Sequence, residues 1–252
     1  MSNVYQKFAS VYDRFMDNIP YQEWSNYLYQ LFCQYQISTG NLVELGCGTG
    51  TLCQLMSQHN FHITGIDLSK DMIKQAKKKK ADRITYITGN MCELQLDDTK
   101  TYDGFYSLCD SMNYLLYDEE VISTLKGVNY YLKPNGIFIF DLKTEYFYQN
   151  RLGNQIFLDQ QKDCSYIWEN QYFKEDLVNQ YDLTLFVKSG FLPFYRRYTE
   201  THHQKAYPLP KMIDFIRQAG LEYVTAYDAF TTNIPTPESE RIYIITRNGE
   251  QK

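Results

Sequence analysis

Short apolar runs alternate with amphipathic segments through the first half of the chain. The apolar runs cover residues 42–45, 61–66, 84–88, 102–108 and 137–140. The segments between them repeat apolar residues every three or four positions, as a helix with one buried face does. Consecutive strands of a parallel sheet need such a crossover, which is right-handed. The order therefore predicts an α/β, Rossmann-like fold with helices on both faces of the sheet.

The pattern changes after Asp141. Three longer segments alternate between polar and apolar positions and are separated by polar turns: residues 164–173, 177–187 and 191–207. Alternation with short turns predicts a three-stranded antiparallel sheet. His202 and His203 are neighbours in the last segment and would face opposite sides of it, which favours packing or surface roles over a paired metal site.

The end of the chain returns to the first pattern. A helix begins at Pro208, and two further strands, 221–227 and 241–246, complete a seven-stranded mixed sheet. We therefore expect residues 1–142 and 208–252 to form the main domain. Residues 143–207 should form a small inserted antiparallel β subdomain over the carboxyl ends of the strands.

Composition limits the classes of partner. The chain has 252 residues and a net charge of −5, which argues against a broad phosphate-binding surface. No stretch approaches the ~20 apolar residues that cross a bilayer, and the first residues lack a signal-peptide core, so a cytoplasmic protein is expected. The six cysteines form no CxxC pair and have no histidine at ligand spacing, so neither a metal nor a disulfide framework is predicted.

The segment LVELGCGTG, residues 42–50, joins a buried strand to a helix through three glycines. Gly46, Gly48 and Gly50 allow positive φ angles and a close approach by a ligand. A dinucleotide-binding turn has the spacing GxGxxG, whereas the third glycine here comes one residue early, which disfavours NAD. Asp67 follows the second strand, 67 − 46 = 21 residues after the first glycine, the separation at which an acidic side chain receives ribose hydroxyls.

An acidic residue at a strand end followed by GxGxG resembles motif I of the class I S-adenosylmethionine-dependent methyltransferases. The segment LKPNG at 132–136, which leads into an apolar strand, resembles the same family. YQKFASVYDRF at residues 5–15 is similar to an uncharacterised bacterial branch, itself similar to sugar N-methyltransferases and glycine N-methyltransferase. The resemblance implies a methyltransferase that uses S-adenosyl-L-methionine as cofactor.

The resemblance also implies roles for individual residues. Tyr12 and Trp24 would meet the methionine end of the cofactor, and Gly46 and Gly48 its backbone. Asp67 would bind the ribose.

The adenine would lie against the loop after the third strand, where Asn90 and Met91 stand. Many relatives have Asp in place of Asn90; Asn can accept a hydrogen bond from the exocyclic amine but carries no charge. Further cofactor contacts are expected from five residues around the turn and the strand ends: Glu44, Cys47, Leu68, Met72 and Cys109.

The loop after the fourth strand would lie beside the transferable methyl group. Asp110 is the candidate general base, with Tyr12 or Asn113 orienting the acceptor. A second interpretation is that Asp110 only caps the next helix.

The acceptor is predicted to be a small molecule, bound between residues 1–24 and the inserted subdomain. Both segments are rich in Tyr and Phe. The aromatic stripe within residues 1–20 could serve as a lid over the cofactor or simply pack on the domain. Two alternatives remain for the whole chain: an RNA (tRNA) methyltransferase and a non-catalytic S-adenosylmethionine-binding regulator.

Overall fold

The computed structural model describes residues 20–79, 81–160, 163–189 and 194–249. Within these residues the centre is a seven-stranded sheet with the order β10-β11-β5-β4-β1-β2-β3. Its strands are β1 (Gly40–Leu45), β2 (Phe61–Asp67), β3 (Ile84–Thr88), β4 (Tyr102–Ser107), β5 (Leu132–Lys143), β10 (Leu221–Asp228) and β11 (Arg241–Asn248). In this sheet β11 runs antiparallel to both of its neighbours, β5 and β10, and all the other strand pairs are parallel. The predicted seven-stranded mixed sheet is confirmed.

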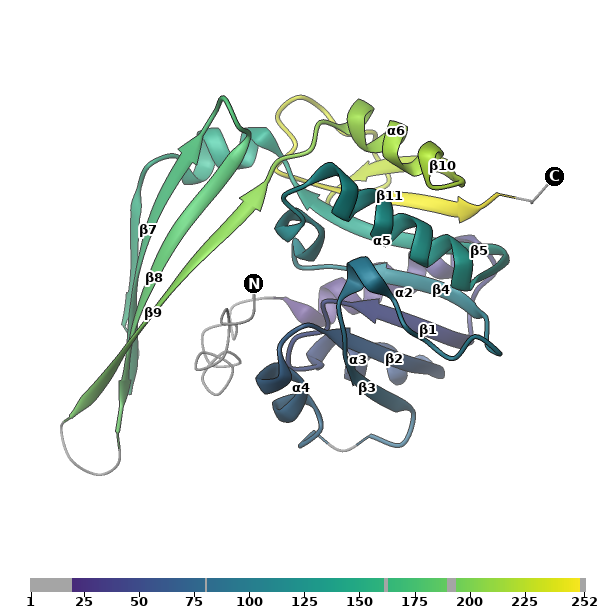
Figure 1. The fold of residues 1–252 in the computed structure, drawn as a ribbon, viewed down its shortest axis with the longest axis horizontal. Coiled ribbons are helices and arrows are strands. Elements are labelled where there is room, and N and C mark those ends of the chain that lie inside the picture. The colour runs from purple at the N-terminus through teal and green to yellow at the C-terminus, as the bar shows by residue number, and fades with distance from the viewer. Residues whose placement is uncertain (1–19, 80, 161–162, 190–193, 250–252) are drawn as a thin grey trace.

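Helices cover both faces of this sheet (Figure 1). The helices are α2 (Tyr21–Gln34), α3 (Thr51–Ser57), α4 (Lys70–Ala76), α5 (Asp118–Tyr131) and α6 (Leu209–Gln218). Three shorter turns of helix are η2 (Met91–Glu93), η3 (Ser111–Tyr114) and the π-helical η4 (Phe147–Leu152). None of the helices in the described part of the chain is long and apolar enough to cross a membrane.

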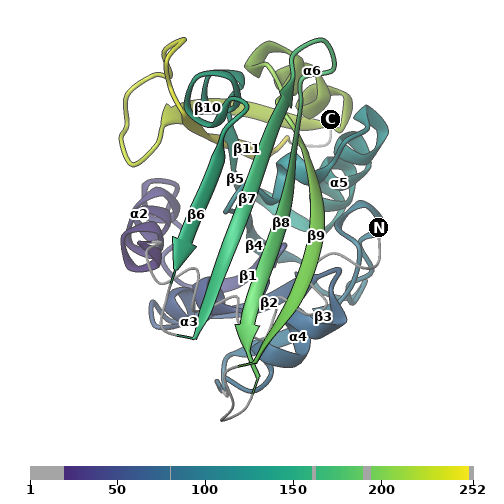
Figure 2. The same ribbon diagram turned by 90° about the vertical axis from the view of Figure 1, so that its left-hand side faces the viewer.

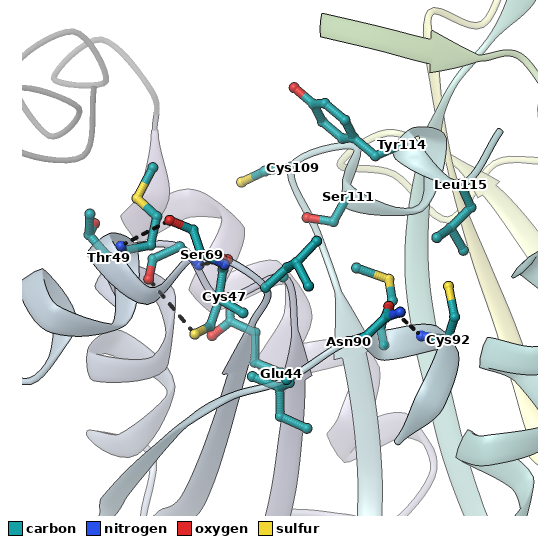
Figure 3. Close-up of a pocket in the computed structure, with 18 of the residues that line it drawn as sticks. Glu44, Cys47, Thr49, Ser69, Asn90, Cys92, Cys109, Ser111, Tyr114 and Leu115 are labelled. Carbon is teal, nitrogen blue, oxygen red and sulfur yellow. Dashed lines mark hydrogen bonds between the residues drawn. The ribbon is translucent and has the colours of Figure 1, made fainter. Parts of the chain in front are cut away.

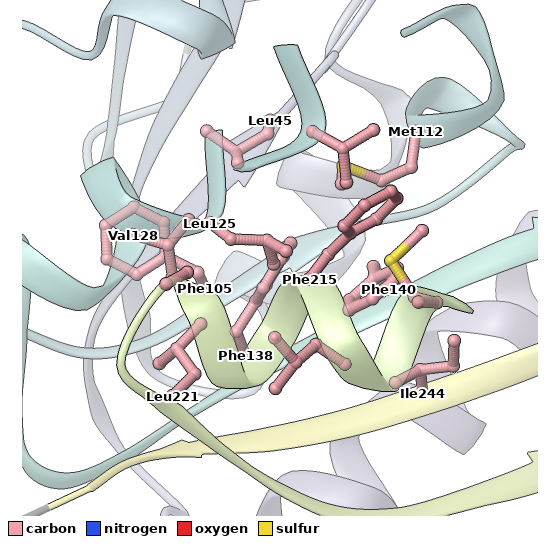
Figure 4. Close-up of a cluster of buried hydrophobic side chains, with 14 of the residues drawn as sticks. Leu45, Phe105, Met112, Leu125, Val128, Phe138, Phe140, Phe215, Leu221 and Ile244 are labelled. Carbon is pink, nitrogen blue, oxygen red and sulfur yellow. The ribbon is translucent and has the colours of Figure 1, made fainter. Parts of the chain in front are cut away.

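The core lies in two layers, one on each side of the sheet. Along β5, Ile137 and Ile139 join the cluster under α2 and α3, whereas Phe138 and Phe140 join the cluster under α5 and α6 (Figure 4). Successive side chains of a strand point to opposite faces, so a strand covered on both sides is apolar at every position. Burial of each large side chain contributes roughly 1.5 to 3 kcal/mol, and this is why the apolar runs identified the strands so well.

The described residues also contain a second, four-stranded antiparallel sheet with the order β6-β7-β8-β9. Its strands are β6 (Ile156–Gln160), β7 (Cys164–Phe173), β8 (Val178–Lys188) and β9 (Tyr195–Lys205). They lie side by side in front of the central sheet in Figure 2. The inserted sheet is therefore present between β5 and α6.

The prediction of three strands in this sheet was wrong by one. The additional strand, β6, pairs with β7 along the edge of the sheet. Its side chains are almost all exposed, including Ile156 and Leu158. A strand without a buried face has no alternation of polar and apolar residues, so the pattern could not reveal it.

Candidate active site

The glycine turn after β1 is held by the backbone of β2. Gly46, Gly48 and Gly50 have φ angles of 74°, 52° and 76°, in the left-handed region where glycine carries no penalty. The N–H groups of Gly46 and Cys47 both donate to the carbonyl of Ile66, at 2.8 and 2.9 Å. A Cβ atom at Gly48 would meet nothing within 4 Å, so this residue faces open space beside the turn.

Asp67 ends β2 directly beside this turn. Its two carboxylate oxygens accept hydrogen bonds from the N–H groups of Gly48 and Ser69, each at 2.8 Å. Burial raises the pKa of Asp67, and these two N–H donors oppose that shift. A carboxylate has about four acceptor positions, so Asp67 can accept two further hydroxyl groups from a ligand.

A cavity of about 500 Å³ opens above the turn. It is enclosed by the glycine turn, the loops after β2, β3 and β4, and strand β9 of the second sheet (Figure 3). Ten of the predicted cofactor residues line it: Glu44, Gly46, Cys47, Gly48, Asp67, Leu68, Met72, Asn90, Met91 and Cys109. The structure thus brings together side chains from four separate parts of the sequence.

Asn90 begins η2 and caps it. Its Oδ1 accepts a hydrogen bond from the N–H of Cys92 at 3.0 Å. In Figure 3, Asn90 and Cys92 lie on one side of Ser111, and Tyr114 lies on the other. Because the oxygen already serves the turn, the amide NH₂ of Asn90 is the group that can donate to a ligand.

Glu44 lies below the turn and is buried. Its Oε2 accepts hydrogen bonds from Cys53 Sγ at 2.7 Å and from the Tyr106 hydroxyl at 3.0 Å. Burial raises the pKa of Glu44 to about 8, and the two donors only partly oppose it. Burial also raises the pKa of Cys47 to about 11, so this thiol is not a nucleophile at neutral pH.

Trp24 does not line the cavity, contrary to the prediction. It is buried on α2, where its ring lies 6.1 Å from the ring of Phe230 and 5.2 Å from the guanidinium of Arg241. Tyr21, one helical turn earlier, lines the cavity instead. Tyr12 and the other residues of the predicted aromatic stripe lie outside the described residues.

Asp110 does not line the cavity either. Its carboxylate lies 3.1 Å from Lys143 Nζ and 3.0 Å from an Arg241 nitrogen, and it accepts a 2.6 Å hydrogen bond from Gln204 Nε2. Burial alone would raise the pKa of Asp110, but the Lys143 and Arg241 cations outweigh it and lower the pKa. A carboxylate held by two cations is a poor proton acceptor, which argues against the predicted general base. Asp110 is the N-cap residue of η3, and its carbonyl accepts a hydrogen bond from the N–H of Asn113 at 3.0 Å, but its side chain makes no capping hydrogen bond.

Asn113 is fully buried and works as a structural link. Its Nδ2 donates to the carbonyls of Lys143 at 3.1 Å and Lys205 at 2.8 Å, and its Oδ1 accepts from the N–H of Lys143. It therefore ties the end of β5 to the end of β9. The prediction that Asn113 orients the acceptor is not supported.

Two residues that the sequence did not single out for chemistry lie in the cavity wall. Tyr114 ends η3, and His202 projects from β9. The Tyr114 hydroxyl lies 3.1 Å from His202 Nδ1. The pair is separated by 88 positions in the sequence, so no local pattern could have joined them.

Comparisons with known proteins identify the family. A family model described as a methyltransferase domain matches residues 42–136. The structure of an S-adenosylmethionine-dependent methyltransferase from Clostridium acetobutylicum superimposes with a TM-score of 0.84 and 25% identity, over 97% of this chain and 99% of that one. The putative methyltransferase YqeM of Bacillus subtilis is 32% identical over 242 residues, 95% of each protein. The chain belongs to the class I S-adenosylmethionine-dependent methyltransferases.

A further structural neighbour of this methyltransferase is a sugar N-methyltransferase from Streptoalloteichus sp. The two superimpose with a TM-score of 0.76 at 15% identity, over 93% of this chain and 92% of the neighbour. At this level of identity the similarity shows the fold. It extends beyond the 95 residues (42–136) that the domain model matches and includes the region of the second sheet.

The cavity of the methyltransferase fits S-adenosylmethionine, the cofactor of the family. The open space at Gly48 leaves room for a ligand against the backbone. Asp67 offers acceptor positions for a ribose diol, and Asn90 and Met91 offer an amide and an apolar surface for a purine. A cavity of about 500 Å³ lies within the usual range for small-molecule sites.

Proposed function

We propose that this methyltransferase transfers the methyl group of S-adenosylmethionine to an amine or hydroxyl of a small molecule. The proposal is carried by one observation: Gly46 and Asp67 of the main domain and Thr201 and His202 of the second sheet line the same cavity. The cofactor residues lie at one end, which leaves the end under β9 for the acceptor. Residues 143–207 would then act as the acceptor-side subdomain, and residues 1–142 with 208–252 as the cofactor domain.

In this proposal the glycine turn and the strand ends hold the cofactor. Gly46 and Gly48 approach its amino-acid end, Asp67 accepts the ribose hydroxyls, and Asn90 and Met91 contact the adenine. The remaining wall comes from the five other predicted contacts that line the cavity: Glu44, Cys47, Leu68, Met72 and Cys109. Hydrogen bonds to a charged carboxylate contribute roughly 1.5 to 3 kcal/mol, which makes Asp67 the strongest single contact.

The chain's main task in such a reaction is to place the acceptor and exclude water. The sulfonium supplies an already activated methyl group, so rate enhancement comes from alignment in a dry site. The cavity end near β9 is built for this, because Tyr114, Leu115 and Leu116 line it from η3 and the loop that follows. The name of the Streptoalloteichus neighbour, a sugar N-methyltransferase, supports a small acceptor that carries an amine.

The test is to incubate the protein with S-adenosylmethionine carrying a radiolabelled methyl group and a bacterial extract separated into RNA, protein and small metabolites. We expect label chiefly in the small-metabolite fraction, with little change between low and physiological salt. Binding to RNA phosphates releases counterions and weakens steeply with salt. Label chiefly in RNA, with activity that collapses at physiological salt, would replace the proposal by the RNA methyltransferase alternative. Absence of label from all fractions, with cofactor binding intact, would favour the non-catalytic regulator.

A further inference from the structure

We propose that Tyr114, His202 and Glu200 form a proton relay that deprotonates the acceptor, and that the acceptor is an amine. The inference rests on the proposed function, because it concerns the acceptor end of the same cavity. It gives these three side chains the general-base role that was predicted for Asp110. The three side chains come from η3 and from β9, the two elements that enclose this end of the cavity.

His202 lies between the other two side chains and contacts each of them through a different ring nitrogen. The Tyr114 hydroxyl lies 3.1 Å from His202 Nδ1, and His202 Nε2 lies 3.4 Å from Glu200 Oε2. A carboxylate opposite Nε2 favours the proton on that nitrogen, which leaves Nδ1 to accept from the Tyr114 hydroxyl. Tyr114 lines the cavity beside Ser111 and Cys109, in the loop that follows β4 (Figure 3).

His202 is fixed in orientation. Its side chain is 1% exposed, and that of Glu200 is 7% exposed. The ring of Tyr181 on β8 stacks on the imidazole with centroids 4.5 Å apart and planes 8° from parallel. Tyr181 also shares a 2.7 Å hydrogen bond with the Tyr114 hydroxyl. The titratable groups that these contacts bring to His202 are thus Tyr114, Tyr181 and Glu200.

The register of the second sheet explains how His202 reaches the cavity. His202 pairs with Tyr181 across β8 and β9, and Gln204, two residues later, projects from the same face. Gln204 donates to Asp110, and Asn113 donates to the carbonyl of Lys205. These two contacts hold the end of β9 against η3. They give Asp110 and Asn113 a positioning role.

A relay that ends on an imidazole can deprotonate an ammonium group far more easily than a hydroxyl group. An ordinary imidazole has a pKa about 4 units below that of an alkylammonium group, but about 9 units below that of a hydroxyl with the acidity of water. The equilibrium constant for proton transfer to an imidazole is therefore about five powers of ten larger for an ammonium group than for such a hydroxyl. An amine also needs this step, since most of it is ammonium at neutral pH and has no lone pair for attack.

The proton and electron balance is complete without a further reactant. The ammonium group gives a proton to the Tyr114 oxygen as the Tyr114 proton passes to His202 Nδ1, and the imidazolium is paired with the Glu200 carboxylate. The freed nitrogen lone pair then forms the bond to the methyl carbon while the methyl–sulfur bond of S-adenosylmethionine breaks and its electron pair stays on sulfur. The proton on His202 leaves to water after the product departs.

The first test needs no acceptor. In protein labelled with ¹⁵N-histidine and bound to S-adenosylhomocysteine, long-range ¹⁵N–¹H correlations report which ring nitrogen carries the proton. His202→Gln assigns the signal among the four histidines of the chain. We expect Nδ1 of neutral His202 to be unprotonated and to shift in Tyr114→Phe. A proton on Nδ1 in the neutral ring, or no response to Tyr114→Phe, would overturn the relay.

The second test is the pH profile of methyl transfer, with the small-metabolite fraction of a bacterial extract as the acceptor probe. Tyr114→Phe and His202→Gln should lower kcat by about 100-fold near pH 7, as loss of a general base does. The loss should shrink as the pH rises, because more of an amine is then already deprotonated. Tyr195→Phe and His62→Gln, both at exposed positions, are the matched controls and should stay within about twofold.

The two tests distinguish failure of the proposed function from failure of the proton relay. Label that enters only RNA would remove the proposed small-molecule acceptor, and the histidine tautomer would still decide the relay. Pure hydroxyl methylation in the product would overturn the amine assignment. Variants whose pH profiles run parallel to that of the parent, with equal affinity for S-adenosylhomocysteine, would reduce Tyr114 and His202 to a structural role.

Discussion

The glycine turn and strand β9 line the same cavity but are held by different kinds of contact. The turn is fixed by backbone hydrogen bonds to the adjacent strand, from Gly46 to Ile66 and from Gly48 to the Asp67 side chain, across about 20 positions. Strand β9 is fixed by side chains that act across more than 90 positions, from Gln204 to Asp110 and from Asn113 to Lys205. The cofactor side is thus a local structure, and the acceptor side depends on tertiary contacts.

The largest expected effect is a loss of stability when the buried ion pairs of Arg241 are broken. Arg241 pairs with Asp110 and Asp141, and Asp141 is fully buried. Arg241→Met leaves the buried carboxylate of Asp141 without its cation, and Asp110 with Lys143 alone. Loss of one partner of a buried ion pair typically costs about 3 to 5 kcal/mol. Urea denaturation should show this loss in the free energy of unfolding.

Arg151→Met is the matched control for this change. Arg151 also pairs with a carboxylate, that of Glu240, but the pair is exposed to solvent. Exposed pairs are screened and add little to stability. The denaturation midpoint of Arg151→Met should match that of the parent, and equal losses in the two variants would show that the buried network does not stabilise the acceptor side.

On the cofactor side, the buried carboxyl group of Glu44 should make the free energy of unfolding depend on pH. Because the pKa of Glu44 is raised to about 8 in the folded protein, folding retains a proton that the unfolded chain loses above about pH 4.5. The stabilisation from this group is therefore complete below pH 4.5 and is lost by about pH 8. Glu44→Gln mimics the protonated form and should be more stable than the parent at pH 9, by on the order of 1 to 3 kcal/mol.

This difference is measured by urea denaturation of both proteins at pH 5, 7 and 9 without cofactor. Other groups titrate equally in both proteins. The pH dependence of the difference between their free energies of unfolding therefore reports on Glu44 alone. A difference that stays constant from pH 5 to pH 9 would show that Glu44 is ionised throughout.

The contrast between the two sides also explains what the sequence could predict. The parallel strands follow from apolar runs, and Gly46 and Asp67 follow from spacing within one βαβ unit. The other predicted contacts that line the cavity, such as Asn90 and Cys109, came from the resemblance to the methyltransferases. Asp110 was correctly placed at the edge of the sheet. The contacts that argue against its predicted role as a general base could not be read from the sequence, because Lys143 and Arg241 belong to the separate strands β5 and β11.

The contacts on the acceptor side leave little pattern in the sequence. The pairing of His202 with Tyr114 depends on the register of β8 and β9 and on the docking of that sheet. The position of Trp24 outside the cavity lining could not be predicted either, since its partners Phe230 and Arg241 lie more than 200 positions away. Strand β6 has no buried face and so no pattern.

The smallest effect tests the docking of β9. Gln204→Leu keeps the size of the side chain but removes its hydrogen bonds with Asp110 and with the Tyr148 hydroxyl. We expect faster hydrogen exchange in the amides of β9 and a fall in turnover of about tenfold, equivalent to about 1.4 kcal/mol. Affinity for S-adenosylhomocysteine should stay the same.

The control is Gln171→Leu, at an exposed position of β7 on the sheet face opposite to that of Gln204. It should leave both the exchange of β9 and the turnover unchanged. Equal exchange in the two variants would mean that Gln204 does not hold the strand.

The central claim is that Asp67 and the glycine turn bind the cofactor, while Tyr114 and β9 serve the acceptor. Titration calorimetry with S-adenosylhomocysteine tests it most directly. Asp67→Ala removes the acceptor of the ribose hydroxyls and should weaken binding by about 10- to 100-fold, or roughly 1.4 to 2.8 kcal/mol. Tyr114→Phe should bind within about twofold of the parent. Equal affinity of Asp67→Ala and the parent, or a comparable loss in Tyr114→Phe, would contradict this division of the cavity.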